Sequence, residues 1–222
     1  MTVELEKQKT PNEWADFWRN DVGVNVIPAN ATTKTTWVQW KKGKAGNWQE
    51  QPIPESFHAS WKKANSFKDG MAVICGRCWH TAKETWLNSI DVDNKLGIDE
   101  FCKLYDCTLE ELSAKTIVEQ TENKNKAHIY FISDSPVASL APATGDVKEK
   151  SDNNELPAIE VKSGGNLLSY CCPGSSEKSR LIIGTRQVSG IKDVTDFNKK
   201  LSDLRKNFGL ETKNSHHTRH LL

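Results

Sequence analysis

The sequence predicts an α/β (α+β) protein in which mixed or antiparallel sheets are flanked by helices. Short apolar or alternating runs recur along the chain and are typical of buried strands. Amphipathic segments with clear end signals lie among these runs and predict helices. One polar segment interrupts the pattern, and no internal repeat is present. Together these observations predict one main folded unit.

The helices are predicted from signals at their ends. Thr10-Pro11-Asn12-Glu13 is a capping box with proline at the first helical position, and Thr108-Leu109-Glu110-Glu111 is a second capping box. Apolar residues from Val194 to Phe208 recur on one helical face, and Gly209 follows them. Further helices are expected at 54–64, with Phe57, Trp61 and Ala64 on one face, and at 98–105.

Strands are expected where apolar residues alternate with polar ones or run together. The predicted ranges are 22–27, 71–75, 86–93, 117–119, 127–133, 158–163, 167–171 and 181–183. The segment from Pro142 to Leu156 is rich in small polar and charged residues, and we expect a mobile insertion there.

The composition is that of an ordinary globular protein. Of its 222 residues, 36% are hydrophobic and 27% are charged, and 30 Lys and Arg against 29 Asp and Glu give a net charge of +1. This balance does not by itself indicate a nucleic-acid-binding protein. No apolar run reaches the length of about 18 residues that a transmembrane helix needs, and the polar N-terminus does not resemble a secretion signal. We expect a cytoplasmic protein without a membrane partner.

Six cysteines in a chain without an export signal are expected to be free thiols or metal ligands. Cys75-Gly76-Arg77-Cys78, with His80 two residues further on, has half the spacing of a zinc site. The other cysteines do not supply the second half at a regular spacing. Because Cys75 ends an apolar run, a buried core residue is the simpler interpretation, and a structural zinc ion is the less favoured one.

Three carboxylates and a histidine occupy strand positions that can share one face. In Ile90-Asp91-Val92-Asp93, the alternation turns both aspartates to one side and both apolar residues to the other. Glu160 has an apolar neighbour on each side, and His128 lies in the strand-like run 127–133. Carboxylate oxygens hold Mg²⁺ or Mn²⁺, and in two-metal sites the ions lie about 3.5 to 4 Å apart and clamp the oxygens of phosphoryl transfer. One strand with two carboxylates, and a neighbour with a third, suits such a site.

The order of these motifs resembles the bifunctional primase-polymerase (prim-pol) domain of the archaeo-eukaryotic primase superfamily, in particular its archaeal and archaeal-plasmid versions. The likeness runs from about Trp14 to Ile191. Its motifs are Lys34-Thr35-Thr36-Trp37-Val38-Gln39-Trp40, the apolar strand that ends at Gly76, Asp91-Val92-Asp93, Lys126-Ala127-His128 and Glu160. Two positions depart from the family pattern: Lys126 stands where a small residue is usual, and Pro173-Gly174-Ser175-Ser176 lacks the usual histidine.

The resemblance implies two abutting sheets with helices outside and a metal-binding cleft, in a primase-like catalytic domain over residues 1–192. A C-terminal amphipathic helix would follow over 193–209, and a tail or the start of a linker over 210–222. The implied ligands of two divalent ions, Mg²⁺ or Mn²⁺, are Asp91, Asp93 and Glu160. His128 would contact the phosphates of the incoming nucleotide, and Lys126, Lys162 and Lys34 are further candidates for phosphate or template contacts.

The implied function is that of a template-dependent nucleotidyl transferase, a DNA primase and DNA polymerase in DNA replication. It would synthesise and extend primers on single-stranded DNA from nucleoside triphosphates. No helicase motif or Walker loop occurs in the sequence. A replicative helicase would therefore lie in another protein or in a longer parent chain.

Other functions stay open on the sequence alone. A metal-dependent nuclease would use the same acids, although no Pro-Asp followed by a Glu-x-Lys triplet is present. A non-catalytic nucleotide- or nucleic-acid-binding module would keep the fold without metal dependence. A polymerase that only extends primers is the nearest enzymatic alternative. Trp37, Trp40 and Trp48 could stack on bases, although tryptophans at this density more often belong to a core.

Overall fold

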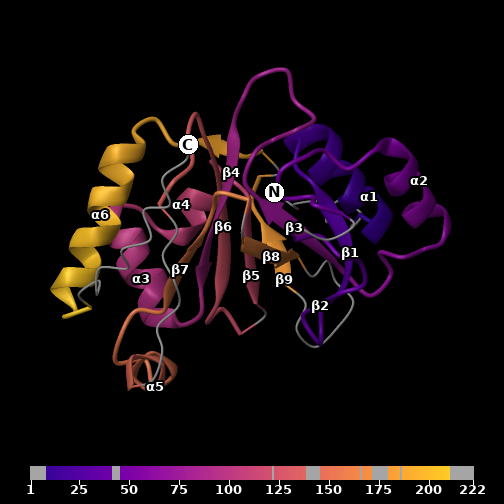
Figure 1. The fold of residues 1–222 in the computed structure, drawn as a ribbon. Coiled ribbons are helices and arrows are strands. Elements are labelled where there is room, and N and C mark those ends of the chain that lie inside the picture. The colour runs from indigo at the N-terminus through magenta and orange to yellow at the C-terminus, as the bar shows by residue number, and fades with distance from the viewer. Residues whose placement is uncertain are drawn as a thin grey trace, which may run out of the picture.

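A computed structural model of the chain describes residues 9–41, 46–121, 123–138, 146–165, 167–171, 180–185 and 187–210. Its strands form two sheets that abut near the middle of the molecule, with helices on either side (Figure 1). Neighbouring strands are antiparallel except for one short parallel pair. The predicted α+β class with antiparallel sheets is therefore confirmed.

The smaller sheet has four strands in the order β2-β1-β3-β8. They are β2 (Thr35–Thr36), β1 (Val26–Asn30), β3 (Met71–Cys75) and β8 (Leu167–Cys171). The ranges of β3 and β8 agree with the prediction. The strand predicted at 22–27 was placed too early, because the first helix continues as a π-helix, η1 (Phe17–Val22), which Gly23 ends with a φ of +90°.

The larger sheet has six strands in the order β7-β4-β6-β5-β9, with the short β10 paired to β6. They are β7 (Ile159–Lys162), β4 (Trp86–Val92), β6 (Ala127–Ser133), β5 (Val118–Thr121), β9 (Arg180–Ile183) and β10 (Ser189–Gly190). β4 has β6 on one side and β7 on the other. This central position makes β4 the strand around which the candidate site is built.

The helices cover the outer sides of the two sheets (Figure 1). They are α1 (Pro11–Asp16) and α2 (Glu55–Lys63) beside the smaller sheet, and α3 (Lys95–Leu104), α4 (Leu109–Ser113), α5 (Asp146–Asp152) and α6 (Val194–Asn207) beside the larger one. Both predicted capping boxes form, at Thr10 and at Thr108. Phe57 and Trp61 share a face of α2 as expected, with ring centroids 5.9 Å apart, but the buried side chain of this helix is His58, and Phe57 is 47% exposed.

The polar segment predicted as a mobile insertion contains a helix. Its described part, 146–156, includes α5, and Asn94 donates two hydrogen bonds to backbone carbonyls there, at Ser151 and Leu156. Its first residues, like the predicted tail 211–222, lie outside the described part of the chain. Among the described helices, none combines the length and the apolar character that crossing a bilayer requires.

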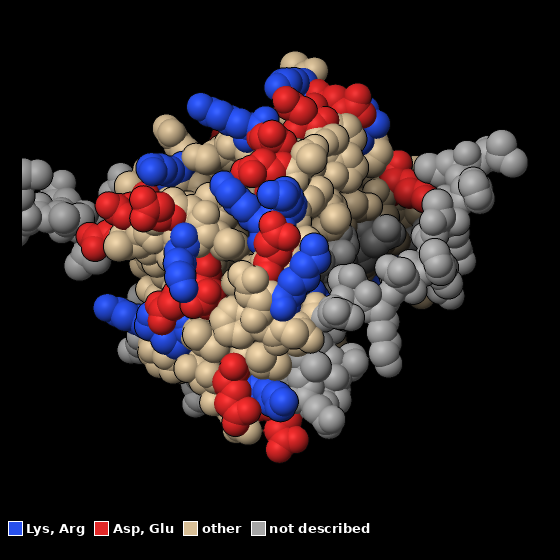
Figure 2. All heavy atoms as spheres, turned by 90° about the vertical axis from the view of Figure 1, so that its left-hand side faces the viewer, with Lys and Arg blue, Asp and Glu red and all other residues tan. Residues whose placement is uncertain are grey.

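The outer face of α6 carries both signs of charge. Lys200 pairs with Asp196, and Lys199 and Lys206 both lie near Asp203. Figure 2 shows Lys and Arg interleaved with Asp and Glu on the side of the molecule that carries this helix. In the described part of the chain, the lysines of α6 therefore belong to a balanced, solvated face and not to a positive patch.

The chain crosses between the sheets at two glycine turns that touch each other. Gly76 follows β3 on the way to β4, and Gly164-Gly165 leads from β7 back to β8. The Gly165 N–H donates to the Cys75 carbonyl at 2.8 Å, and a Cβ on Gly76 would lie 2.5 Å from the Gly165 nitrogen. Gly164 and Gly165 have φ of +73° and +75°, which favours glycine. This contact holds the end of β7 against the smaller sheet.

A buried polar cluster ties the N-terminal helices to the loops beneath them. The Arg19 guanidinium donates to the Ile53 carbonyl at 3.0 Å and lies 3.0 Å from His80 Nε2. Arg19 also pairs with Glu55 at 3.0 Å. Because a guanidinium only donates, His80 accepts through Nε2 and is neutral. Burial first, and then the Arg19 charge, lower the pKa of His80 from 6.5 to about 4.

This lowered pKa predicts an acid-sensitive fold. Unfolded His80 binds a proton near pH 6.5, whereas folded His80 resists it until about pH 4. The unfolded state thus holds more protons in this window, and the free energy of unfolding falls as the pH drops from 6.5 to 4. Burial also lowers the pKa of His58, although Asp16 opposes this.

We expect His80→Gln to show a smaller loss of stability than the wild type between pH 7 and pH 5, as measured by urea unfolding. Equal losses in the two proteins would contradict the assignment.

Candidate metal centre

The two faces of the larger sheet differ in character. The outer face is apolar, and its members pack against α3 and α6: Ile90, Val92, Val118, Ile129 and Val161. The inner face turns toward the smaller sheet, and there Leu87 and Tyr130 join a core with residues of η1 and β3. Strand alternation then places Asp91 on the inner face, since Ile90 and Val92 are committed to the outer one. The predicted alternation is confirmed for Ile90, Asp91 and Val92, whereas Asp93 lies beyond the end of β4.

The strand register aligns four ionisable side chains in one row across the inner face. Asp91 of β4 is directly opposite Glu160 of β7 on one side and His128 of β6 on the other. His128 is in turn opposite Glu119 of β5. Directly opposite residues of a sheet share a face and have adjacent side chains. We call this set, Glu160, Asp91, His128 and Glu119, the charged row.

His128 lies between two carboxylates of the row. Its Nε2 is 3.1 Å from Asp91 Oδ1, and its Nδ1 is 2.9 Å from Glu119 Oε2. All three side chains are nearly inaccessible to solvent. Buried carboxylates are costly unless they are paired. The contacts of its two nitrogens with Asp91 and Glu119 therefore hold the His128 ring in place.

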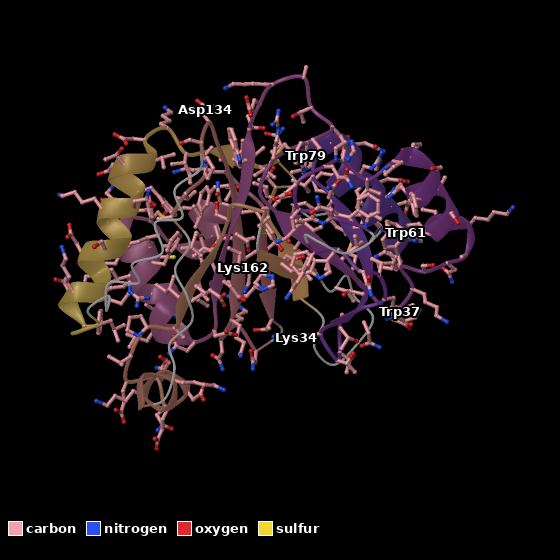
Figure 3. All side chains as sticks on the ribbon, viewed as in Figure 1. Lys34, Trp37, Trp61, Trp79, Asp134 and Lys162 are labelled. Carbon is pink, nitrogen blue, oxygen red and sulfur yellow. The ribbon has the colours of Figure 1, made fainter. Side chains whose placement is uncertain are left out.

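Lys162 joins the other two carboxylates of the row. Its ammonium lies 2.9 Å from Glu160 Oε2 and 3.5 Å from Asp91 Oδ2. Burial opposes the charged form of this lysine, but the two carboxylates outweigh burial and raise its pKa. Figure 3 shows Lys162 near the middle of the molecule, where β7 approaches β8. The Lys162 ammonium is thus the positive charge that lies between Asp91 and Glu160.

Asp93 and Lys126 form a neighbouring pair beyond the row. Asp93 is the residue after the end of β4, its side chain is 47% exposed, and its Oδ1 is 2.9 Å from Lys126 Nζ. The structure therefore brings together Asp91, Glu160, His128 and Lys162, and it places Asp93 and Lys126 one step nearer to solvent. Lys34 lies on the smaller sheet, at the turn before β2, and in Figure 3 it is below Lys162.

The donor set fits a hard divalent cation. Asp91 and Glu160 present oxygens to one positive charge already, and carboxylate oxygens are the preferred ligands of Mg²⁺ and Mn²⁺. Asp93, two residues from Asp91, would be the third ligand. In the described part of the chain, no three His, Cys, Asp or Glu side chains are grouped closely enough to hold an ion without rearrangement. A bound ion would replace the Lys162 ammonium between the two buried carboxylates.

The cysteine motif has a different surrounding. Cys75 and Cys78 are buried, and burial raises the pKa of Cys75 to about 12 and that of Cys78 above its usual value. A zinc ligand must be a thiolate, and this environment favours the thiol. His80, the third member of the motif, is engaged by Arg19. These contacts favour the core interpretation of the motif.

Sequence reasoning missed Glu119. The predicted strand 117–119 ends on it, yet a single carboxylate at the end of a short apolar run carries no distinctive signal. Its alternation with Val118 matches that of Glu160 with Val161, and this was the available clue. Only the pairing of β5 with β6 shows that Glu119 faces His128.

No family model matches the sequence. No curated protein matches it either.

The paired carboxylates predict divalent-ion binding that depends on both acids. We expect Asp91→Asn and Glu160→Gln each to weaken Mn²⁺ binding by at least about tenfold, because each removes a charged ligand. A titration of the protein with Mn²⁺, monitored by electron paramagnetic resonance, measures the concentration of the free ion directly. Glu84→Gln is the matched control, since Glu84 pairs with Arg77 at an exposed position. Unchanged affinity in both site variants would contradict the site.

Proposed function

We propose that the chain is a template-dependent nucleotidyl transferase, a DNA primase and DNA polymerase with a prim-pol type catalytic domain over residues 1–192. The observation that carries the proposal is the row on the inner face of the larger sheet, where Asp91 and Glu160 share a cation beside His128. The order of the motifs along the chain supports the same family. The activity would use nucleoside triphosphates on a single-stranded DNA template in the cytoplasm.

The proposed roles follow from the positions of the side chains. Asp91, Glu160 and Asp93 would hold Mg²⁺ or Mn²⁺, which supply charge neutralisation at the phosphates and an activated primer hydroxyl. His128 Nε2 points along the row toward Asp91, and as an N–H it would donate to a phosphate that an ion holds beside Asp91. Lys162 offsets the repulsion between Asp91 and Glu160 in the ion-free protein, and as a flexible point charge it suits phosphate.

Positioning and electrostatics account for most of the catalysis in this class of reaction. A primer hydroxyl attacks the α-phosphorus of a nucleotide, a new phosphodiester bond forms, and pyrophosphate leaves. The apolar outer face of the larger sheet fixes the strands that carry the row, since Ile90, Ile129 and Val161 are fully buried. The carboxylates are therefore held in a stable arrangement before any substrate arrives.

A primer-synthesis assay tests the proposal. We expect the purified chain to make products on single-stranded DNA with all nucleotides and Mg²⁺ or Mn²⁺, with or without an annealed primer, as resolved on a sequencing gel. Asp91→Ala and Glu160→Ala should each abolish synthesis while the protein stays folded, because the carboxylate that remains keeps its ion pair with Lys162.

Each other outcome has a defined meaning. Extension only from a primer would leave a polymerase whose initiation depends on another domain or protein, such as one that carries a helicase. Shortened input strands would identify a nuclease. Full activity in either alanine variant would overturn the metal-site assignment.

The aromatic residues near β2 suggest where a template strand runs. Trp37, which follows β2, is 51% exposed, whereas Trp48 is buried in the core beneath the smaller sheet. Trp40 packs partly against the same core, and the Lys41 ammonium lies 5.6 Å from its ring. Lys34 lies on the turn just before β2 (Figure 3). An exposed ring three residues after Lys34 suits base stacking on a strand whose phosphates a lysine could neutralise.

Trp37→Ala should therefore weaken the binding of single-stranded DNA by about tenfold, since one stacked base contributes about 1–3 kcal/mol. Fluorescence anisotropy of a labelled oligonucleotide measures the loss. Trp79→Ala is the matched control, because Trp79 is a tryptophan beside a cation, Arg77, and in Figure 3 it lies near the top of the molecule, whereas Trp37 lies toward the lower right. Equal losses in the two variants would argue against a template path at β2.

A further inference from the structure

The proposed chemistry leaves one ionisable group of the charged row without a role. Glu119 is 3% exposed, and it lies at the far end of the row from Lys162. Its Oε2 is 2.9 Å from His128 Nδ1 and 2.9 Å from the Tyr130 hydroxyl. A buried carboxylate in such a position requires donors around it, and these two groups supply them.

The contact with Glu119 defines the state of the His128 ring. An ionised carboxylate only accepts hydrogen bonds, so His128 Nδ1 must carry a hydrogen and donate it. The opposite nitrogen, Nε2, then points toward Asp91. The choice of Nδ1 as the donor, and the direction of Nε2, both depend on the acceptor at Glu119.

The Glu119 carboxylate is also held by a second donor, the Tyr130 hydroxyl. Tyr130 is fully buried, donates to Glu119, and packs its ring 4.7 Å from that of Trp18. Tyr130 and His128 are two residues apart on β6 and therefore share its inner face. Glu119 thus has a donor from each of these residues and little freedom to turn away.

We infer that Glu119 is a positioning residue, which accepts from the Nδ1–H of His128 and so keeps Nε2 on the Asp91 side of the ring, where an Nε2–H can donate to the triphosphate of an incoming nucleotide. This inference rests on the proposed function for the presence of that triphosphate. For a histidine that ligates a metal, removal of the partner of its second nitrogen typically costs about 10- to 100-fold in affinity or activity, and we expect an effect of that order for the phosphate contact of His128. Without Glu119 the ring can flip and present carbon in place of Nε2.

Two substitutions distinguish the role of Glu119 as a hydrogen-bond acceptor from the role of its negative charge. Glu119→Leu removes the acceptor at similar size, whereas Glu119→Gln keeps a carbonyl oxygen that can still accept from Nδ1–H. A double variant, Glu119→Leu with Tyr130→Phe, avoids leaving the buried tyrosine hydroxyl without its acceptor if the single leucine variant unfolds. Asp16→Asn is the matched control, because Asp16 lies 3.0 Å from Nε2 of the buried His58, in a carboxylate–histidine pair away from the row.

The experiment has a spectroscopic and a binding readout. In protein labelled with ¹⁵N-histidine, the His128 Nδ1–H resonance, identified by its absence in His128→Gln, should be present in the wild type, in Glu119→Gln and in Asp16→Asn. It should be lost in the leucine variants. The Kd for dATP with Mn²⁺, measured calorimetrically without template, should rise about tenfold or more in the leucine variants only.

Enzyme kinetics then separate positioning from chemistry. In primer extension the KM for dATP should rise with the Kd in the leucine variants, while kcat changes much less. Folded leucine variants that keep the wild-type Nδ1–H resonance or the wild-type Kd would overturn the role of Glu119. A wild type that binds dATP but makes no product would overturn the proposed function alone, because the resonance and the Kd would still report on Glu119.

Discussion

The pairing of β4 with β6 on one side and β7 on the other is the constraint on which the rest of the site depends. Because the side-chain period of a strand is two residues, the burial of Ile90 and Val92 against α3 and α6 commits Asp91 to the inner face. A shift of one residue in either pairing would turn a charged side chain into the apolar core. The free energy of core packing therefore specifies the register that aligns the charges.

The charged row shows how several buried charges coexist in one small region. Three carboxylates lie close together, and they are separated by one histidine and flanked by one lysine. Each nitrogen-bearing side chain, His128 and Lys162, is shared by two acids, and Asp91 contacts both of them. Removal of either partner would leave a carboxylate buried without full compensation. The row is thus stable as a set, and its members act together.

Local sequence signals predicted much of the fold. The apolar runs of β3 and β6 and the capping boxes at Thr10 and Thr108 determine structure through nearby residues, and all of these were found as expected. The displaced start of β1 and the helix α5 depend on context, since η1 and the contacts of Asn94 decide them. The convergence of Asp91, His128 and Glu160 was predictable from alternation, whereas the ion pairs of Lys162 and the partner of His128 at Glu119 required the strand order.

The place of β7 at the edge of the larger sheet links the site to the order of folding. Asp91 and Glu160 meet only when β7 docks on β4, and α3, α4, β5, β6 and α5 all lie between these strands in the chain. Such non-local pairings close large loops and form slowly. A nascent chain that has not yet reached β7 has no cation site at all. A ligand that binds Asp91 and Glu160 together consequently favours the completed sheet over partly folded states.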